Sequence, residues 1–252
     1  MTTDEQVVDV SQDWVLACDV QQRFMQGLGR ASASVDCSAR CRQVRALGGD
    51  CYDFMPLTDS RLAFLVGDAS GKGLAAALMI ANIQSSLRTA TLFGGNDLAA
   101  LVQIVNHQAY TSSLADRYAT VFYGVFDGAT RTLRYVNAGH NPPLVLRHNG
   151  SVDRLENGGA PVGMFPDSAY QESVVQLSCG DLVVAYSDGV VEASNRLGEE
   201  WGVEGLLKAA SACAPRCAED VEDLVGFIFS SLNEFSIGCQ SDDATVAVLR
   251  VL

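Results

Sequence analysis

Residues 61–79, RLAFLVGDASGKGLAAALM, decide how the chain folds. The first seven residues are almost all apolar, which favours a strand, and residues 72–93 are rich in Ala and Leu, which favours a helix. Asp68 stands between the two, directly after the apolar run. Because such a strand is buried on both faces, a carboxylate at its end is expected at the rim of the core.

The segments on either side extend this pattern. Towards the N-terminus we predict a helix at 11–27, a strand at 33–45, and a strand at 50–57 that forms a hairpin with 61–67. A second helix at 97–114, capped by Asn96 or Asp97, follows the first one. The remaining predicted strands are 118–127, 131–137, 142–147, 151–155, 170–177, 181–187 and 243–252, and the remaining predicted helices are 202–212 and 217–235.

Strands and helices are therefore grouped in blocks and do not alternate. Grouping of this kind disfavours a doubly wound sheet and favours the α+β class. We expect two stacked antiparallel β-sheets flanked by helices, an αββα sandwich. Residues 1–27 are expected to be an acidic tail and an N-terminal helix, which either packs on its own domain or is a docking or dimerising segment for regulation, and residues 28–252 a single catalytic domain.

The composition limits the partners. The chain has 252 residues with 30 acidic and 17 basic side chains, a net charge of −13. A surface with this charge disfavours nucleic acid and anionic lipid. Because no apolar run approaches the roughly 18 residues of a membrane span and the N-terminus is acidic, we expect no membrane segment, no signal peptide and a cytoplasmic location.

The eight cysteines invite a zinc interpretation, because Cys37/Cys41 and Cys213/Cys217 have C-x3-C spacing. If 33–44 is a strand, however, the Cys37 and Cys41 positions lie about 13 Å apart along it. We therefore interpret these cysteines as small buried hydrophobic residues.

Acidic residues stand where predicted strands end or turn. They are Asp50, Asp68, Asp188 and the pair Asp242-Asp243. Any one of them alone could be an ordinary turn or helix cap. Converging carboxylates would repel one another, and hard divalent cations normally neutralise such oxygen-rich sites.

Other catalytic patterns fail. Gly67–Gly73 lacks the spacing and the hydroxyl of a phosphate loop, and Ser70 lacks the glycine of a nucleophile elbow. We place His107 on a helix and His148 in a turn, and we interpret His140 as structural.

Six motifs together carry a resemblance: GGDCYDF (48–54), VGDASGKGLAAALM (66–79), VNAGHNPPL (136–144), GGAPVGM (158–164), LSCGDLVVAYSDGVVEASN (177–195) and SDDATVAVL (241–249). In this order and spacing the chain resembles the metal-dependent protein phosphatases of type 2C, in their bacterial SpoIIE/RsbU-like branch. The resemblance runs from about Trp14 to the C-terminus. It implies a β-sandwich with helices on both outer faces.

The resemblance also implies a site. Asp50, Asp68, Asp188 and Asp242 match the family's metal-binding acids, and Ala69 matches a metal-binding backbone carbonyl. Two Mn²⁺ or Mg²⁺ ions are implied, and a water that bridges them, not a side chain, is the nucleophile. Asp53 and Asp243 lie near enough to be indirect ligands. Ser70 replaces the histidine of eukaryotic relatives, and the phosphate-binding arginine has no match, with Lys72 as an alternative contact.

The expected function is a serine/threonine phosphoprotein phosphatase acting on an anti-sigma-factor antagonist in a bacterial signalling or stress-response pathway. Alternatives are a catalytically silent scaffold that binds a phosphoprotein, and a small-molecule phosphatase. Because only a short segment precedes the first predicted helix, we expect regulation by a separate protein or by self-dimerisation through that helix.

Overall fold

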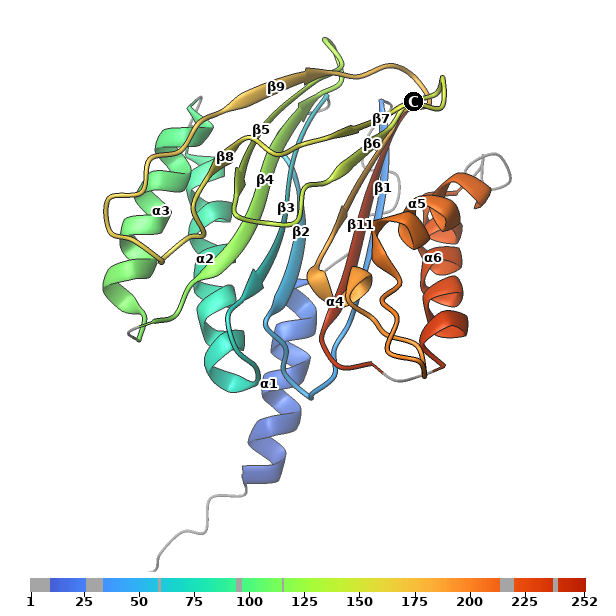
Figure 1. The fold of residues 1–252 in the computed structure, drawn as a ribbon. Helices are drawn as coiled ribbons and strands as arrows, with labels where there is room; N and C mark the ends of the chain where they lie inside the picture. The colour runs from blue at the N-terminus through green and yellow to red at the C-terminus, as the bar shows by residue number, and fades with distance from the viewer. Residues whose placement is uncertain are drawn as a thin grey trace, which may run out of the picture.

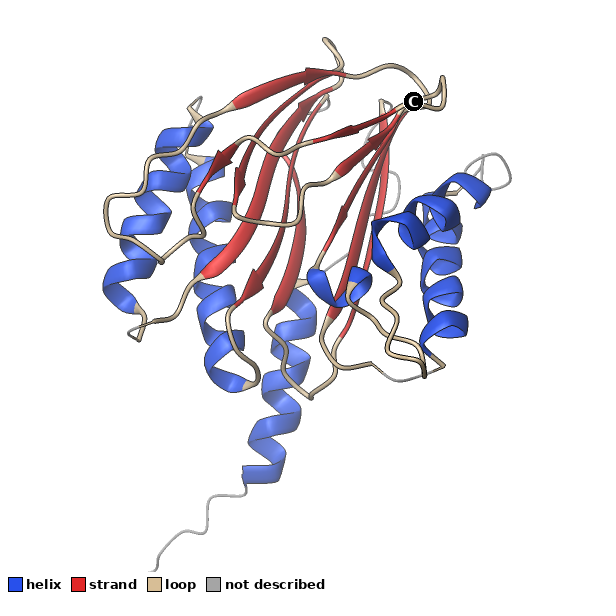
Figure 2. Ribbon diagram, in the orientation of Figure 1, coloured by secondary structure: helices blue, strands red, loops and turns tan. Residues whose placement is uncertain are grey.

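The computed structural model describes residues 10–25, 34–58, 60–93, 97–114, 116–213, 220–237 and 240–252. In these residues two β-sheets lie face to face, and helices cover both outer faces (Figure 1). Helices and strands are segregated into layers, as Figure 2 shows. The predicted αββα sandwich is confirmed.

One sheet is six-stranded in the described part of the chain. Its order is β2 (Asp50–Pro56), β3 (Arg61–Ala69), β4 (Ala119–Asp127), β5 (Thr132–Ala138) and β8 (Gly158–Gly159), with β9 (Ser173–Gln176) also paired to β5. The β5–β8 pair is parallel, so this sheet is mixed and not wholly antiparallel.

The other sheet has five described strands. Their order is β1 (Val35–Arg42), β11 (Ala244–Val251), β10 (Leu182–Tyr186), β6 (Leu144–Leu146) and β7 (Val152–Arg154). All of its pairings are antiparallel.

The long helices pack on the two outer faces. On the six-stranded sheet lie α2 (Leu74–Leu92) and α3 (Leu98–Ser112), and on the five-stranded sheet α5 (Gly202–Cys213) and α6 (Val221–Ser236). The short α4 (Asp188–Val191) follows β10, and α1 (Val10–Phe24) extends away from one end of the sandwich. None of the helices in the described ranges is long and apolar enough to cross a membrane.

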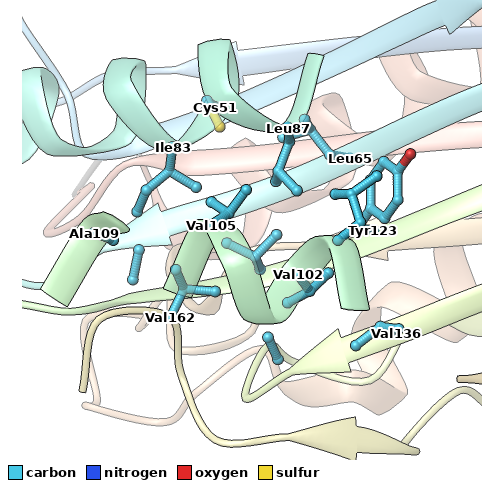
Figure 3. Close-up of a cluster of buried hydrophobic side chains, with 14 of the residues drawn as sticks. Cys51, Leu65, Ile83, Leu87, Val102, Val105, Ala109, Tyr123, Val136 and Val162 are labelled. Atoms are coloured by element: carbon cyan, nitrogen blue, oxygen red, sulfur yellow. The ribbon is translucent and has the colours of Figure 1, made fainter. Parts of the chain in front are cut away.

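Central strands are buried on both faces, which explains their unbroken apolar runs. On β3, Phe64 and Val66 point into the layer between the sheets, whereas Ala63 and Leu65 point towards α2 and α3. The helix-facing core, drawn in Figure 3, also holds Val102, Val105 and Tyr123. Between the sheets, aromatic rings pack against one another across strands: the tilted rings of Phe64 and Phe122 have their centroids 5.5 Å apart.

Several predicted boundaries move for identifiable reasons. The strand predicted at 170–177 begins only at Ser173, because Glu172 turns to bond Arg134 and the backbone N–H of Leu98. The strand predicted at 142–147 begins after Pro142 and Pro143, which have no N–H to donate to a ladder. The sequence did not predict α4 or β8.

The helix predicted at 11–27 ends at Phe24, and its expected stop at 27–29 lies outside the described residues, as does the proposed domain boundary at 27/28. Asp97 caps α3, its carboxylate accepting the N–H of Ala100 at 2.9 Å, as one of the two predicted alternatives. Cys37 and Cys41 lie on one strand, β1, and neither forms a disulfide with another described cysteine. The side chain of Cys213, and Cys217, lie outside the description.

Candidate metal centre

The acidic residues gather where the layer between the sheets ends. Asp50 and Asp68 are paired in the register of β2 and β3. Side chains alternate along a strand, so Asp50 shares a face with Tyr52 and Phe54, and Asp68 shares a face with Phe64 and Val66. That face is the one between the sheets. Both carboxylates therefore lie on the inner face of the six-stranded sheet, at the end of the core between the two sheets.

Asp50 is almost completely buried, with 1% of its surface exposed. Its Oδ2 accepts a hydrogen bond from the Thr245 hydroxyl at 2.6 Å. Burial raises the pKa of Asp50 to about 7, and the negative charges of Asp243 and Asp188 add to this, although the hydroxyls of Thr245 and Ser187 oppose it. The side chain is thus held in place by β11 of the opposite sheet.

Three neighbouring acids contribute to the raised pKa of Asp68. Burial, together with the charges of Asp50, Asp188 and Asp242, raises the pKa of Asp68 to about 9. Its carboxyl group is also hydrogen-bonded to that of Asp50, which requires a shared proton. The repulsion that the sequence predicts for converging carboxylates is therefore present.

Asp188 and Asp242 complete the group from the five-stranded sheet. Asp188 is the first residue of α4, and burial followed by the charge of Asp242 raises its pKa, against the backbone N–H of Gly189 and the charge of Lys72. Asp242 precedes β11, and its Oδ2 lies 2.8 Å from the Nζ of Lys72. Lys72 also donates to the carbonyl of Ser241 at 2.7 Å. Both of these contacts tie Lys72 to the segment that carries Asp242. Its role as a phosphate contact stays a prediction.

The carbonyl of Ala69 opens towards Gly49. The N–H of Ala69 bonds the Gly49 carbonyl at 3.0 Å, closing the end of the β2–β3 hairpin. A Cβ on residue 49 would lie 2.9 Å from the Ala69 oxygen. At that distance a side chain on residue 49 would displace the Ala69 carbonyl, which explains the second glycine of GGD.

The donor set suits hard divalent cations. Four carboxylates and the Ala69 carbonyl supply only oxygen atoms, the ligands that Mg²⁺ and Mn²⁺ prefer. A cation would also relieve the repulsion that raises the pKa values of Asp50, Asp68 and Asp188. As the side chains stand, no three His, Cys, Asp or Glu groups among the described residues are arranged to hold one ion. The residues thus fit the ions in chemistry, and their role as ligands stays a prediction.

Sequence reasoning missed the residues that orient these acids. Thr245 holds Asp50, and the Ser187 hydroxyl accepts the Thr245 N–H at 2.9 Å. The carboxylate of Asp243 accepts the N–H groups of Val44 at 2.8 Å and Gly49 at 2.9 Å. A hydroxyl next to each acidic motif, in YSDG and DDAT, was the available signal.

Other candidates have structural roles. Asp53, buried at 1% exposure, is bound by the Arg88 guanidinium, Nε to Oδ2 2.8 Å, and so is not a free ligand. His140 is buried beside Thr120, with 2.9 Å between Nδ1 and Oγ1, and burial lowers its pKa to about 4. His107 is exposed on α3 and His148 is exposed in the turn after β6.

Comparison with known proteins identifies the lineage. The family model described as "Stage II sporulation protein E (SpoIIE)" matches residues 58–252. Protein IcfG of Synechocystis sp. is 29% identical over 240 residues, covering 82% of this chain and 36% of IcfG. Phosphoserine phosphatase RsbU of Bacillus subtilis is 24% identical over 245 residues, covering 96% of this chain and 71% of RsbU. The chain thus spans little more than a third of IcfG.

Solved structures share the fold. The SiaA-PP2C domain of Pseudomonas aeruginosa superimposes with a TM-score of 0.80 at 19% identity, covering 96% of each chain. The catalytic domain of the serine threonine protein phosphatase PstP, in complex with two manganese ions, superimposes with a TM-score of 0.63 at 17% identity, covering 87% of this chain and 98% of that one. With the matched family model and this PP2C fold, the chain belongs to the SpoIIE family.

Proposed function

We propose that the chain is a metal-dependent serine/threonine phosphoprotein phosphatase. The observation that carries this proposal is the cluster of Asp50, Asp68, Asp188 and Asp242, four acids from separate segments, of which burial and mutual repulsion raise the pKa of the first three. A fold gains no stability from crowding unpaired carboxylates, so a function that needs them is the economical explanation. The name of RsbU, a phosphoserine phosphatase, points to the same chemistry.

The residues that would hold two divalent cations are Asp50, Asp68, Asp188 and Asp242, with the carbonyl of Ala69. When bound, the two ions would activate a water as nucleophile and neutralise the charge of the phosphate. Mn²⁺ and Mg²⁺ are the candidates.

Other side chains of the protein hold the proposed metal ligands in position. The Thr245 hydroxyl fixes the orientation of Asp50, and Asp243 fixes the backbone of Gly49 from inside the sandwich. Lys72 ties the loop after β3 to the loop before β11, so Asp68 and Asp242 approach one another from two sheets. Nucleophilic attack does not require a side chain in this arrangement.

The proposed substrate is phosphoserine or phosphothreonine on an anti-sigma-factor antagonist, in a cytoplasmic bacterial signalling or stress-response pathway. Support comes from the relatedness to RsbU and to the family of the sporulation protein. The alternatives are a small-molecule phosphatase and a silent scaffold that binds the phosphoprotein without turnover.

A comparison of three substrates tests this assignment. Phosphate release is measured with Mn²⁺ on a phosphorylated antagonist protein, on free phosphoserine and on an aryl phosphate. The proposal expects the highest kcat/KM for the phosphoprotein. Preference for free phosphoserine favours the small-molecule alternative, and binding of the phosphoprotein without release favours the scaffold.

The N-terminal helix is the proposed partner surface. Leu16, Val20 and Phe24 recur every four residues on α1 and so form one stripe, with exposed fractions of 60%, 51% and 46%. Trp14 is also exposed. An apolar stripe on a helix that extends from the sandwich suits a second copy of the same helix, and we infer self-association through α1, with a regulatory protein as the alternative partner.

A further inference from the structure

An arginine lies on the turn that follows Asp68. The guanidinium of Arg117 occupies the space that a Cβ on Gly71 would fill, and its Nη1 donates to the carbonyl of Ser70 at 2.9 Å. Gly71 is the third residue after Asp68, and three residues of backbone span at most about 11 Å. The guanidinium is therefore close to the proposed metal centre.

The charge of Arg117 is not neutralised within the described part of the chain. No carboxylate among the described residues forms an ion pair with it, whereas Lys72, on the same turn, is paired with Asp242. Arg117 is exposed, and a guanidinium has five N–H donors in a planar fork, so most of them are available to an anion. In a chain with a net charge of −13, this cation favours an acidic group on a partner.

A small hollow opens beside Arg117, between α2 and the end of α3. It has a volume of about 290 Å³, and Leu78, Met79 and Leu114 are among the residues that line it. Leu78 and Leu114 are 64% and 72% exposed. Two large apolar side chains that face one hollow and stay in water are typical of a surface that a partner covers.

Ser70 joins the hollow to the metal loop. It lines the hollow, and it follows Asp68 by two residues. Its N–H donates to the carbonyl of Tyr118 at 2.8 Å, and its hydroxyl accepts the N–H of Tyr118 at 3.1 Å. These bonds continue the pairing of β3 with β4, so the backbone fixes Arg117 relative to Asp68.

We propose that Arg117 and this hollow form a docking site for the phosphoprotein substrate, occupied by the segment next to its phosphorylated residue. The proposal rests on the proposed function and adds the sequence that a substrate needs. An acidic side chain of the substrate pairs with Arg117, and an apolar side chain packs between Leu78 and Leu114. Because an extended segment advances about 3.3 Å per residue, the acid is expected within about three positions of the phosphorylated residue.

Synthetic phosphopeptides test the charged part of the site. Glutamate is placed in turn at the three positions on either side of a phosphoserine in an otherwise neutral peptide, and each peptide has a partner with lysine there. The Mn²⁺-dependent kcat/KM of the two is compared for the wild type, R117E and the control R131E. Arg131 is an exposed arginine at the opposite end of the β4–β5 pair.

We expect the wild type and R131E to prefer glutamate about fivefold at one of these positions, the size of effect of an exposed ion pair. R117E should prefer lysine at the same position. Each variant is compared with itself on two peptides, so a change in its folded fraction does not alter the ratio. A wild type without a preference for glutamate at any position, or an R117E variant that keeps the wild-type preference, would overturn the proposal.

The apolar part is tested in the same way with leucine and alanine at the positions next to the phosphoserine. The wild type should prefer leucine, and L114N should lose this preference. I104N, at a residue of α3 that is 69% exposed and does not line the hollow, should keep it. Equal preferences in L114N and the wild type would contradict the role of the hollow.

Failure of the proposed function has a different signature. If no peptide releases phosphate, fluorescence anisotropy measures binding of the same labelled peptides in Mn²⁺. A preference for glutamate that R117E reverses would then support the docking site and count against phosphatase activity. Binding without that preference would overturn the docking site itself.

Discussion

Asp50 and Asp68 are cross-strand partners whose carboxyl groups share a hydrogen bond at the end of the inner layer. The pair is unfavourable without a cation, because burial and the charges of neighbouring acids raise the pKa of both carboxyl groups, so keeping them together in the folded chain costs free energy at neutral pH. We expect D68N to raise the melting temperature of the metal-free chain, by ~2–4 °C for each 1 kcal/mol of repulsion removed. Calorimetry in EDTA measures this.

The same variant is expected to lose stabilisation by Mn²⁺, because the ligand is gone. D167N, at an exposed acid away from the cluster, serves as the control and should behave as the wild type. A lower melting temperature for D68N in EDTA would mean that the two acids do not repel one another in the folded chain.

The Arg88–Asp53 pair supports the β2–α2 contact. Asp53 is buried, whereas half of the Arg88 side chain is exposed. We expect R88M to lower the free energy of unfolding by about 2 kcal/mol, because it leaves a buried carboxylate without its partner. Urea denaturation measures the loss. The double variant D53N/R88M should recover part of this loss. The control R196M, at an exposed arginine, should leave the free energy of unfolding unchanged. Equal losses for R88M and R196M would mean that the Arg88–Asp53 pair does not stabilise the fold.

His140 predicts a pH dependence of stability. Burial lowers its pKa to about 4, although the neighbouring backbone of Tyr186 opposes the shift. The unfolded chain takes up a proton below its ordinary pKa of about 6.5, while the folded chain stays neutral until about 4, so stability falls as pH drops through that window. The lowered pKa corresponds to about 3 kcal/mol.

Denaturation curves between pH 7 and pH 4 compare the wild type with H140Q. The variant should lose less stability than the wild type across the window, since it has no imidazole to protonate. H107Q, at an exposed histidine, should follow the wild type. Parallel curves for H140Q and the wild type would show that His140 titrates alike in both states.

Self-association through α1 can be tested by one charge. V20E places a carboxylate in the stripe of Leu16, Val20 and Phe24, where a partner helix would bury it. Sedimentation equilibrium should give dimers for the wild type and monomers for V20E. Q12E is the matched control on the same helix. A wild type that stays monomeric at the highest concentration measured would contradict self-association and favour a regulatory protein as the partner of this stripe.

The sequence predicts the sandwich well because its central strands are continuous apolar runs and its hairpin turns carry recognisable dipeptides. The apolar run of 61–67 reports burial on both faces, and in the structure β3 faces helices on one side and the opposite sheet on the other. The turn dipeptides Asp127-Gly128 and Asn149-Gly150 stand between β4 and β5 and between β6 and β7. Edge strands were less predictable: β9 begins only after Glu172, whose side chain binds Arg134.

The acids were predictable as a group, whereas their supports were not. Asp50, Asp68, Asp188 and Asp242 stand at strand or helix ends, which local pattern reveals. The Thr245–Asp50 bond joins residues 195 positions apart. It has no local signal, because it depends on how two elements meet in space. The structure also assigns Asp53 to Arg88, a contact that the spacing of GGDCYDF does not reveal.

The central claim is that Asp50, Asp68, Asp188 and Asp242 support metal-dependent phosphate hydrolysis. The most direct measurement is Mn²⁺-dependent release of phosphate from an aryl phosphate by the full chain, D188N and D167N. We predict release that requires Mn²⁺, falls at least about a hundredfold in D188N, equal to about 2.7 kcal/mol of transition-state stabilisation, and persists in D167N. Release that continues in EDTA, or that D188N retains in full, would contradict the account.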